Sequence, residues 1–323
     1  MLGAAYGAVV SRQSLDIGGL RRSFTVVRPV PARENAPVVL VFHGAYQSAR
    51  TLRLATRRAL DGVVNTSGAI VAYLDSHRWH WNDARVDTSF AARTAAVDEV
   101  SFTTAVIDRL GRSHGADVSR VHAVGFSNGG YLVFRLLHEI PERLAGAAVI
   151  AATQPVAENF APRTSRIHPL PTLLIHGTGD RVVPYGGGRV TLGGRHSGGT
   201  CLSARETAEY YARRNGVDVA AVSAMSAVSA VPAPSPCGRG VYPTGIRTDL
   251  VEYTEFRQDP HPPVVLCTVH GGGHAIPTAG RTLGSLLRQD RRGFDSVRVI
   301  GDFFGLAVRP APPGGTPGGG AAG

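Results

Sequence analysis

The chain has 323 residues, of which 43% are hydrophobic and 18% charged, a composition that suits a large packed α/β domain and excludes a globally disordered chain. No stretch approaches the roughly 18 consecutive apolar residues that a membrane-spanning helix needs, so we expect no membrane span. The formal net charge is +10, but all 34 basic residues are arginines scattered along the chain, and without a basic stripe interleaved with aromatic residues we expect no nucleic-acid partner.

Short apolar runs and helical patterns alternate along the sequence. Strands are predicted at 37–42, 68–74, 121–124, 147–151, 172–176, 251–256 and 264–269, and the Val-rich apolar run 37–42 is typical of a buried strand. Helices are predicted at 97–112, where apolar residues recur at helical spacing, at 131–140, which ends before Pro141, and at 203–215, which Gly216 follows. This alternation predicts an α/β fold, with a mostly parallel central sheet and helices on both faces.

The ordered body is expected to form one domain over residues 1–308. Residues 217–248 are rich in Ala, Ser, Val, Pro and Gly without a clear period, and we interpret them as an irregular insertion. Residues 309–323 contain mainly Gly, Pro and Ala, so they are predicted to form a disordered tail that cannot contribute to a core.

The pattern Gly125-Phe126-Ser127-Asn128-Gly129 directly follows a predicted strand and opens a predicted helix. The motif G-x-S-x-G in this context indicates a sharp strand-to-helix turn that presents a serine hydroxyl above the carboxyl edge of the sheet. Ser127 is therefore the candidate nucleophile, and the alternative is a serine that only caps the helix.

A serine nucleophile needs a base, and that base needs an acid to orient it. On this kind of fold the expected chain order is serine, acid, histidine. His274 follows three glycines after the strand 264–269, and Asp180 follows the strand 172–176. These two are the candidate base and acid. The competing residues of each type are His261 and His270 for the base and Asp218, Asp249 and Asp259 for the acid.

Stabilising the negatively charged intermediate requires two backbone donors. One is the amide of Asn128, the residue after the candidate nucleophile, and the other should come from the loop after the strand 37–42. Gly44 allows a close backbone approach in that loop, so the second donor is the amide of Ala45 or, as the alternative, of Tyr46. Tyr46 and Gln47 of the same loop are candidate substrate contacts.

No metal or organic cofactor is expected. The three cysteines, Cys201, Cys237 and Cys267, have neither CxxC spacing nor paired histidines, so a zinc site is not indicated, and one disulfide remains possible. The first ten residues lack a basic segment and a clear cleavage site, so no signal peptide is visible.

These features resemble the polyhydroxybutyrate depolymerase and feruloyl or acetylxylan esterase family of α/β-hydrolases. The matching segments lie between about residues 38 and 304 and are VVLVFHGAYQ, WND, VDEVSF, VGFSNGGYLVFRL, LLIHGTGDRVVPYGGG, SARETAEYYARRNG and VHGGGH. The resemblance implies an α/β-hydrolase fold with Ser127, Asp180 and His274 as the catalytic triad. It also implies that Trp81 and Asn82 line the acyl or leaving-group pocket, although Trp81 could instead be a core aromatic residue.

Three positions depart from the family pattern. Ala45 and Val217 stand where relatives often carry cysteine, and Ile276 stands where they often carry tryptophan. The first leaves a backbone donor intact, the second changes the family's disulfide pattern, and the third leaves the substrate class open. Family members are often exported, so an extracellular location is expected, with a cytoplasmic location as the alternative because no export signal is visible.

The function expected from sequence is a serine esterase that acts on a small or oligomeric ester without an obligate protein partner. Two other functions stay open. One is a serine peptidase of the prolyl oligopeptidase type, which shares the motif and the triad order, although no propeller domain precedes this body. The other is a non-catalytic binding protein with a hydrolase fold, a class that usually lacks a triad member.

Overall fold

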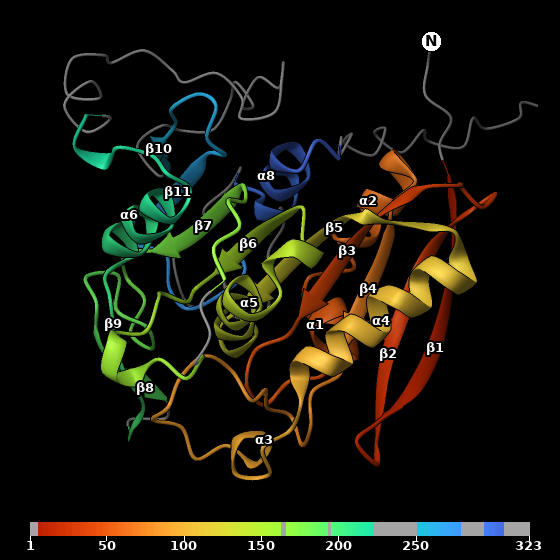
Figure 1. Cartoon of the computed structure of the whole chain (residues 1–323), viewed down its shortest axis with the longest axis horizontal. Coiled ribbons are helices and arrows are strands. Elements are labelled where there is room, and N and C mark those ends of the chain that lie inside the picture. The colour runs from red at the N-terminus through yellow and green to blue at the C-terminus, as the bar shows by residue number, and fades with distance from the viewer. Residues whose placement is uncertain (1–5, 163–165, 193–194, 222–250, 279–293, 307–323) are drawn as a thin grey trace, which may run out of the picture.

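A mixed sheet of nine strands forms the centre of the molecule, with strand order β1-β2-β4-β3-β5-β6-β7-β11-β10 (Figure 1). The structure is a computed structural model that describes residues 6–162, 166–192, 195–221, 251–278 and 294–306. The sheet strands are β1 (Gly7–Ile17), β2 (Leu20–Val30), β3 (Ala36–Phe42), β4 (Ile70–Leu74), β5 (Ala116–Phe126), β6 (Gly146–Ile150), β7 (Thr172–Gly177), β10 (Val251–Phe256) and β11 (Val264–Val269). Strands β8 (Gly188–Leu192) and β9 (Arg195–Cys201) form a separate hairpin.

Helices cover both faces of the sheet (Figure 1). The described helices are α1 (Ala49–Ala55), α2 (Asp61–Ser67), α3 (Ala91–Thr94), α4 (Glu99–His114), α5 (Asn128–Glu139), α6 (Ala204–Arg214) and α8 (Ser296–Phe303), with short 3₁₀ turns at Pro141–Arg143 and Ala157–Asn159. Helices α4, α5 and α6 pack on one face, and α1, α2 and α8 pack on the other. The fold is therefore the predicted α/β-hydrolase arrangement.

Strand β3 shows why the sequence forms a two-sided core. All seven of its residues are buried, and they alternate between the two faces, with Leu40 in the core under α4 and α5 and Val39 and Val41 in the core under α1 and α8. A strand buried on both faces has no polar side, which explains its continuous apolar run.

The six central strands are all parallel, so their carboxyl ends lie at one edge of the sheet. β3 pairs with β5 so that Phe42 lies opposite Gly125, and β11 pairs with β7 so that Val269 lies opposite Gly177. β6 joins these two pairs in parallel register. The loops that follow β3, β5, β7 and β11 consequently leave from the same edge, where ligands bind in open α/β sheets.

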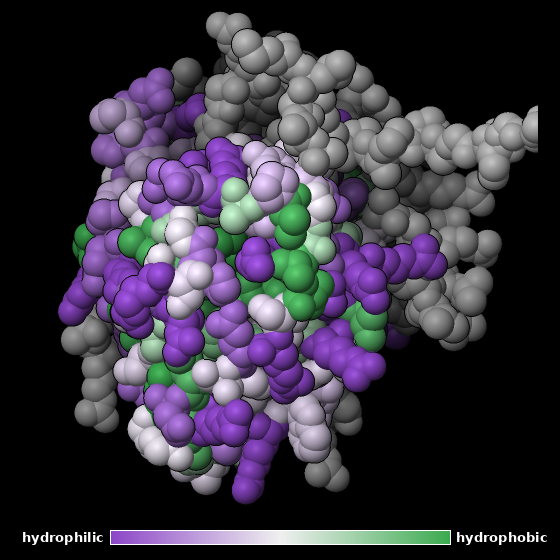
Figure 2. Space-filling model, turned by 90° about the vertical axis from the view of Figure 1, so that its right-hand side faces the viewer, coloured by the Kyte–Doolittle hydropathy of each residue, from purple (hydrophilic) through white to green (hydrophobic). Residues whose placement is uncertain are grey.

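The outer strands were not all expected. β1 and β2 form an antiparallel hairpin that the sequence analysis does not predict, and β2 pairs antiparallel with β4. Most of β1 is exposed or half-exposed at the sheet edge, so it lacks the continuous apolar run of a central strand. Figure 2 looks at this side and shows hydrophobic surface within a mostly hydrophilic face; Val9 and Val10 of β1 are among the exposed apolar residues.

Some predictions fall on parts of the chain that the structure does not describe. The expected insertion at 217–248 lies outside the described residues apart from 217–221, as does the expected tail at 309–323. Across the described ranges, no helix combines the length and apolar character that crossing a membrane would require.

Candidate active site

Ser127 occupies a strained turn between β5 and α5. Its backbone has φ 52° and ψ −117°, a left-handed conformation that non-glycine residues rarely adopt. Its amide donates to the Ile150 carbonyl at 2.9 Å, which ties the turn to the end of β6. The side chain is only partly buried, so the hydroxyl is presented at the carboxyl edge of the sheet.

The two glycines of the motif let the backbone pass where no side chain fits. A Cβ atom on Gly125 would lie 2.3 Å from the Gly129 carbonyl oxygen, and one on Gly129 would lie 2.2 Å from the Phe42 carbonyl oxygen. Both distances are far below van der Waals contact. The turn can therefore pack directly against the end of β3 only with glycine at these positions.

His274 joins the candidate nucleophile to the candidate acid. Its Nε2 lies 2.9 Å from the Ser127 Oγ, and its Nδ1 lies 2.8 Å from the Asp180 Oδ2. With Asp180 ionised, the Nδ1–H donates to the carboxylate, and Nε2 is left to accept the serine proton. Ser127 and Asp180 lie 147 and 94 positions before His274 in the sequence. Hydrogen bonds to the two nitrogens of His274 thus connect them in the folded protein.

Asp180 is held as an anion by hydrogen bonds on both of its oxygens. Oδ1 accepts from the amides of Val182 and Val183 at 2.8 and 2.9 Å, while Oδ2 faces His274. Burial alone would raise the pKa of this carboxyl, but the hydrogen bond and charge of His274, together with the Val183 amide, hold the pKa below its ordinary value.

The competing histidines and acids lie in other settings. His270 pairs with Glu252 at 3.1 Å with 44% of its side chain exposed, and His261 packs beside Gly216. Asp218 is exposed and accepts from the amides of Ala220 and Ala221. None of these residues is placed against Ser127, whereas Asp249 lies outside the described residues.

The two expected backbone donors leave neighbouring strands at the same edge. Asn128 is the first residue of α5, and Ala45 follows β3. The alternative donor, the Tyr46 amide, is already bonded to the Trp79 carbonyl at 3.0 Å. The loop is shaped by a hydrogen bond from the Gly44 amide to the Gln47 Oε1 at 3.0 Å. The Gln47 side chain, a predicted substrate contact, therefore bonds within its own loop.

The structure does not support the expected substrate contacts of Trp81 and Asn82. Trp81 is 0% exposed, and its indole N–H donates to the His43 carbonyl at 2.8 Å. The Asn82 side-chain Nδ2 donates to the Val97 carbonyl at 2.9 Å. Both side chains make their hydrogen bonds inside the protein, because the WND segment runs between the loop after β3 and α5 rather than along an open surface.

Two residues near this segment were missed by the sequence analysis. Trp79 is 63% exposed and, like the predicted contact Tyr46 at 67%, lies beside the β3 loop. Asp83 is fully buried, and its Oδ2 accepts from the Asn128 side-chain amide at 2.5 Å. Trp79 could have been noticed from the clustered aromatic residues of the sequence WHW, but no local pattern indicates the Asp83 contact.

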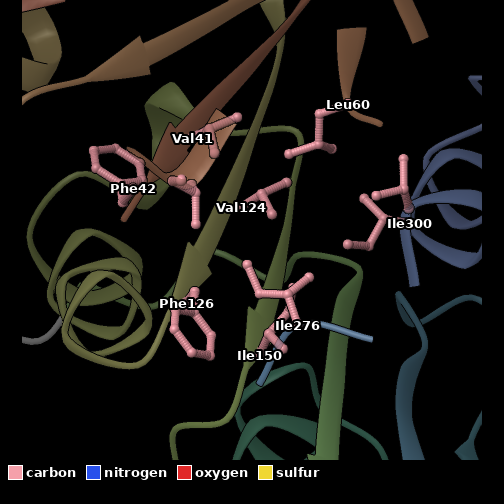
Figure 3. A pocket seen from close by; sticks show the side chains of 10 residues that line it. Val41, Phe42, Leu60, Val124, Phe126, Ile150, Ile276 and Ile300 are labelled. Carbon is pink, nitrogen blue, oxygen red and sulfur yellow. The ribbon is translucent and has the colours of Figure 1, made fainter. Parts of the chain in front are cut away.

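An apolar pocket lies on the α8 side of the sheet, next to the loop that carries His274. Figure 3 shows Phe126 and Val124 of β5, Ile150 of β6 and Ile276 arranged around it, with Ile300 of α8 opposite. Ile276 packs against the core on this face. The residue that replaces the family's frequent tryptophan therefore serves as a hydrophobic anchor two positions after His274.

The described residues contain no group of three or more His, Cys, Asp or Glu side chains that could hold a metal ion. Cys201 and Cys267 are buried free thiols, and burial raises the pKa of Cys201 to about 11. Cys237 lies outside the described residues. The groups that this site offers for chemistry are a hydroxyl, an imidazole, a carboxylate and backbone amides, a set suited to acyl transfer.

A model of the phospholipase/carboxylesterase family matches residues 25–192. The esterase candidate NocK of Nocardia uniformis subsp. tsuyamanensis is 30% identical over 76% of this chain and 66% of its own length. Feruloyl esterase B of Piromyces equi is 30% identical over 47% of this chain and 28% of its own length. This chain thus spans about two thirds of the first relative and less than a third of the second.

One solved structure is similar to nearly the whole of this chain. The acetyl xylan esterase from Aspergillus awamori superposes with a TM-score of 0.55 at 15% identity, covering 92% of this chain and all of that one. Similarity of this extent at such low identity shows a shared fold.

Proposed function

Because the chain belongs to the phospholipase/carboxylesterase family of α/β-hydrolases, we propose that it is a serine esterase with Ser127, His274 and Asp180 as its catalytic triad. The observation that carries this proposal is the position of His274, 2.9 Å from the serine oxygen and 2.8 Å from the carboxylate. That arrangement is the one in which an imidazole can take the serine proton and keep its orientation.

The reaction follows from the hydrogen-bond directions. Ser127 Oγ attacks the ester carbonyl carbon while its proton moves to His274 Nε2, and the carbonyl oxygen becomes an oxyanion. His274 then gives the proton to the leaving alcohol, and the acyl group stays on Ser127. A water molecule, deprotonated by His274, attacks the acyl-enzyme and releases the acid.

The oxyanion is proposed to bind to the backbone amides of Ala45 and Asn128. Ala45 is favoured over Tyr46 because the Tyr46 amide already donates to Trp79. Each such donor typically contributes a factor of about 10²–10³ to kcat, since it points to where the negative charge develops.

The substrate is proposed to be a soluble ester of small or oligomeric size. Tyr46 and Trp79 are exposed, and a backbone hydrogen bond joins them at the proposed oxyanion loop; aromatic faces pack well on sugar or aromatic rings. The resemblance includes acetylxylan and feruloyl esterases, and feruloyl esterase B is among the relatives, so acetylated and feruloylated sugars are the first substrates to test, followed by hydroxybutyrate oligomers.

The test is Ser127→Ala assayed on a short-chain nitrophenyl ester. We expect kcat to fall by about 10⁶-fold, the scale seen when a triad nucleophile is removed. Ser11→Ala on the edge strand β1 is the matched control and should leave kcat unchanged. Retention of more than a tenth of wild-type activity in Ser127→Ala would overturn the assignment.

Two further measurements separate the competing functions. Faster cleavage of peptide amides than of matched esters would favour a peptidase. Failure of a fluorophosphonate probe to label Ser127 in the wild-type protein would favour a non-catalytic binding protein.

A further inference from the structure

The two proposed oxyanion donors come from loops that are far apart in sequence. Ala45 follows β3, whereas Asn128 begins α5 after β5. Both amides must point at one oxygen atom, so the distance between these loops has to be fixed within a fraction of an ångström. Residues 79–83 run between the two loops and hydrogen-bond to both.

The first set of contacts holds the loop after β3. The Trp79 carbonyl accepts from the Tyr46 amide at 3.0 Å, and the Trp81 indole N–H donates to the His43 carbonyl at 2.8 Å. These bonds flank Ala45 on both sides, since His43 and Tyr46 lie two residues before it and one after it. The Trp81 ring also packs edge-on against Phe42 at the end of β3, with ring centroids 5.5 Å apart.

The second set of contacts holds Asn128 by its side chain. The Trp81 amide donates to the Asn128 Oδ1 at 2.9 Å, and the Asn128 Nδ2 donates to the Asp83 Oδ2 at 2.5 Å. Asn128 is buried. Its side chain is therefore held by residues 79–83, which leaves its backbone N–H to face the proposed oxyanion.

Asp83 is itself fixed by a buried ion pair. The Arg85 Nη2 lies 2.6 Å from the Asp83 Oδ2, with both side chains buried, and the Arg85 amide donates to the Asp83 Oδ1 at 2.8 Å. The Arg85 guanidinium lies 3.9 Å above the ring of Tyr131 in α5. The positive charge of Arg85 thereby balances the negative charge of the Asp83 carboxylate and holds it against the same helix that carries Asn128.

We propose that residues 79–83 form a clamp that sets the separation of the Ala45 and Asn128 amides, with Trp81 and Asp83 as positioning residues of the esterase reaction. The inference rests on the proposed function, because it assigns a role in building the same oxyanion site. Neither residue touches substrate; each acts through the backbone donor that it holds.

The experiment compares Asp83→Asn and Trp81→Phe with the wild-type protein. Active sites are first titrated with a fluorophosphonate, so that every rate refers to folded, reactive protein. We then measure kcat and KM on a nitrophenyl acetate and the affinity of an alkyl boronic acid, which forms a tetrahedral adduct on the serine. A displaced donor weakens binding of the tetrahedral state more than binding of the ground-state ester.

In both variants we expect kcat per titrated site to fall by about 10–100-fold, less than for complete loss of a donor. KM should change by no more than about threefold, and boronic acid affinity should fall in parallel with kcat. Asp61→Asn is the matched control, because it breaks the Arg53–Asp61 ion pair of 2.7 Å between α1 and α2. It should lower thermal stability and leave kcat per titrated site unchanged.

The outcomes separate this inference from the function on which it rests. A wild-type protein that neither cleaves the ester nor labels at Ser127 overturns the proposed function and the clamp with it. An active wild type whose two variants keep their kcat and boronic acid affinity overturns the clamp alone. Because Asp83→Asn leaves Arg85 buried with a weakened partner, that variant could fail to fold, and Trp81→Phe, which retains an aromatic ring in the core, then decides the question.

Discussion

At the residue scale, the proposed acid has two histidines beside it, and their hydrogen bonds give them different roles. His274 Nδ1 lies 2.8 Å from the Asp180 Oδ2, whereas His176 Nε2 lies 3.6 Å away. The His176 Nε2–H donates to the Val183 carbonyl at 2.9 Å, and burial lowers the pKa of His176. His176 is therefore neutral near pH 7 and leaves the carboxylate to His274.

Replacing Asp180 with asparagine tests the proposed role of this carboxylate. The amides of Val182 and Val183 both donate to Oδ1. The asparagine oxygen will therefore take the Oδ1 position to accept these two bonds, and its NH₂ group will face His274. The imidazole must then carry its proton on Nε2, where it can no longer accept from Ser127. We expect kcat to fall by about 10⁴-fold through this tautomer change.

The matched control is Asp218→Asn, since Asp218 is exposed and caps a turn. It should keep wild-type kcat. Ester hydrolysis by Asp180→Asn at more than a tenth of the wild-type rate would show that another group orients the imidazole.

At the element scale, the ends of β7 and β11 approach each other more closely than side chains would permit. A Cβ atom on Gly177 would lie 2.2 Å from the Gly272 carbonyl oxygen. The Gly179 amide donates to that same oxygen at 2.8 Å, and the Thr178 amide donates to the Val269 carbonyl at 3.1 Å. These contacts bind the loop that carries Asp180 to the loop that carries His274.

Gly177→Ala should push these two loops apart, because the clash is with backbone that cannot rotate away. We expect a fall of about 10²-fold or more in kcat/KM, the effect of displacing catalytic groups by around 1 Å, together with a lower Tm. Steady-state kinetics and thermal unfolding measure the two effects.

Gly273→Ala supplies a control within the same loop. A Cβ atom on Gly273 meets no atom within 4 Å, so the substitution should leave both kcat/KM and Tm close to wild type. If Gly177→Ala behaves like Gly273→Ala, the close approach of the two loops does not position the site.

At the scale of the whole molecule, buried histidines make the fold sensitive to acid. Burial lowers the pKa of His43, His122 and His138 to about 4 from an ordinary value of 6.5. The unfolded chain therefore binds more protons than the folded one between these two pH values. Stability conferred by keeping these histidines neutral is fully present above pH 6.5 and is lost as pH falls toward 4, by roughly 3 kcal/mol for each histidine.

Urea unfolding at about pH 7.5 and about pH 5 measures this loss. His122 packs against Phe304 with ring centroids 4.3 Å apart, and its Nδ1 has no hydrogen-bond partner, so His122→Phe preserves the ring contact and removes the ionisable group. We expect the difference in unfolding free energy between the two pH values to shrink by about 2 kcal/mol in this variant, the contribution of His122 alone.

His270→Gln is the control, because it replaces a histidine that is exposed rather than buried. Its pH dependence should match that of the wild type. An unfolding free energy that does not change between the two pH values in the wild-type protein would contradict the role of the buried histidines.

Local sequence determined the elements that are buried on both faces. The predicted strand 264–269 coincides with β11, and 37–42 differs from β3 by one residue, because a continuous run of apolar side chains fits best in a strand buried on both faces. The prediction 251–256 also coincides with β10, although only the two end residues of this edge strand are buried. The motif around Ser127 and the glycines before His274 are likewise local signals, so the sequence alone was enough to nominate them.

Only the tertiary structure decided what depends on contacts between distant segments. The antiparallel hairpin β1–β2 forms one edge of the sheet, and because β1 is exposed or half-exposed, its sequence lacks the continuous apolar run of a buried strand. Trp81 and Asn82 were expected at a substrate pocket, yet both are buried and hydrogen-bond to the backbone of His43 and Val97. The register of the parallel strands brings Ser127, Asp180 and His274 within hydrogen-bond distance, and no single stretch of sequence specifies that register, because it arises from side chains packing across the whole sheet.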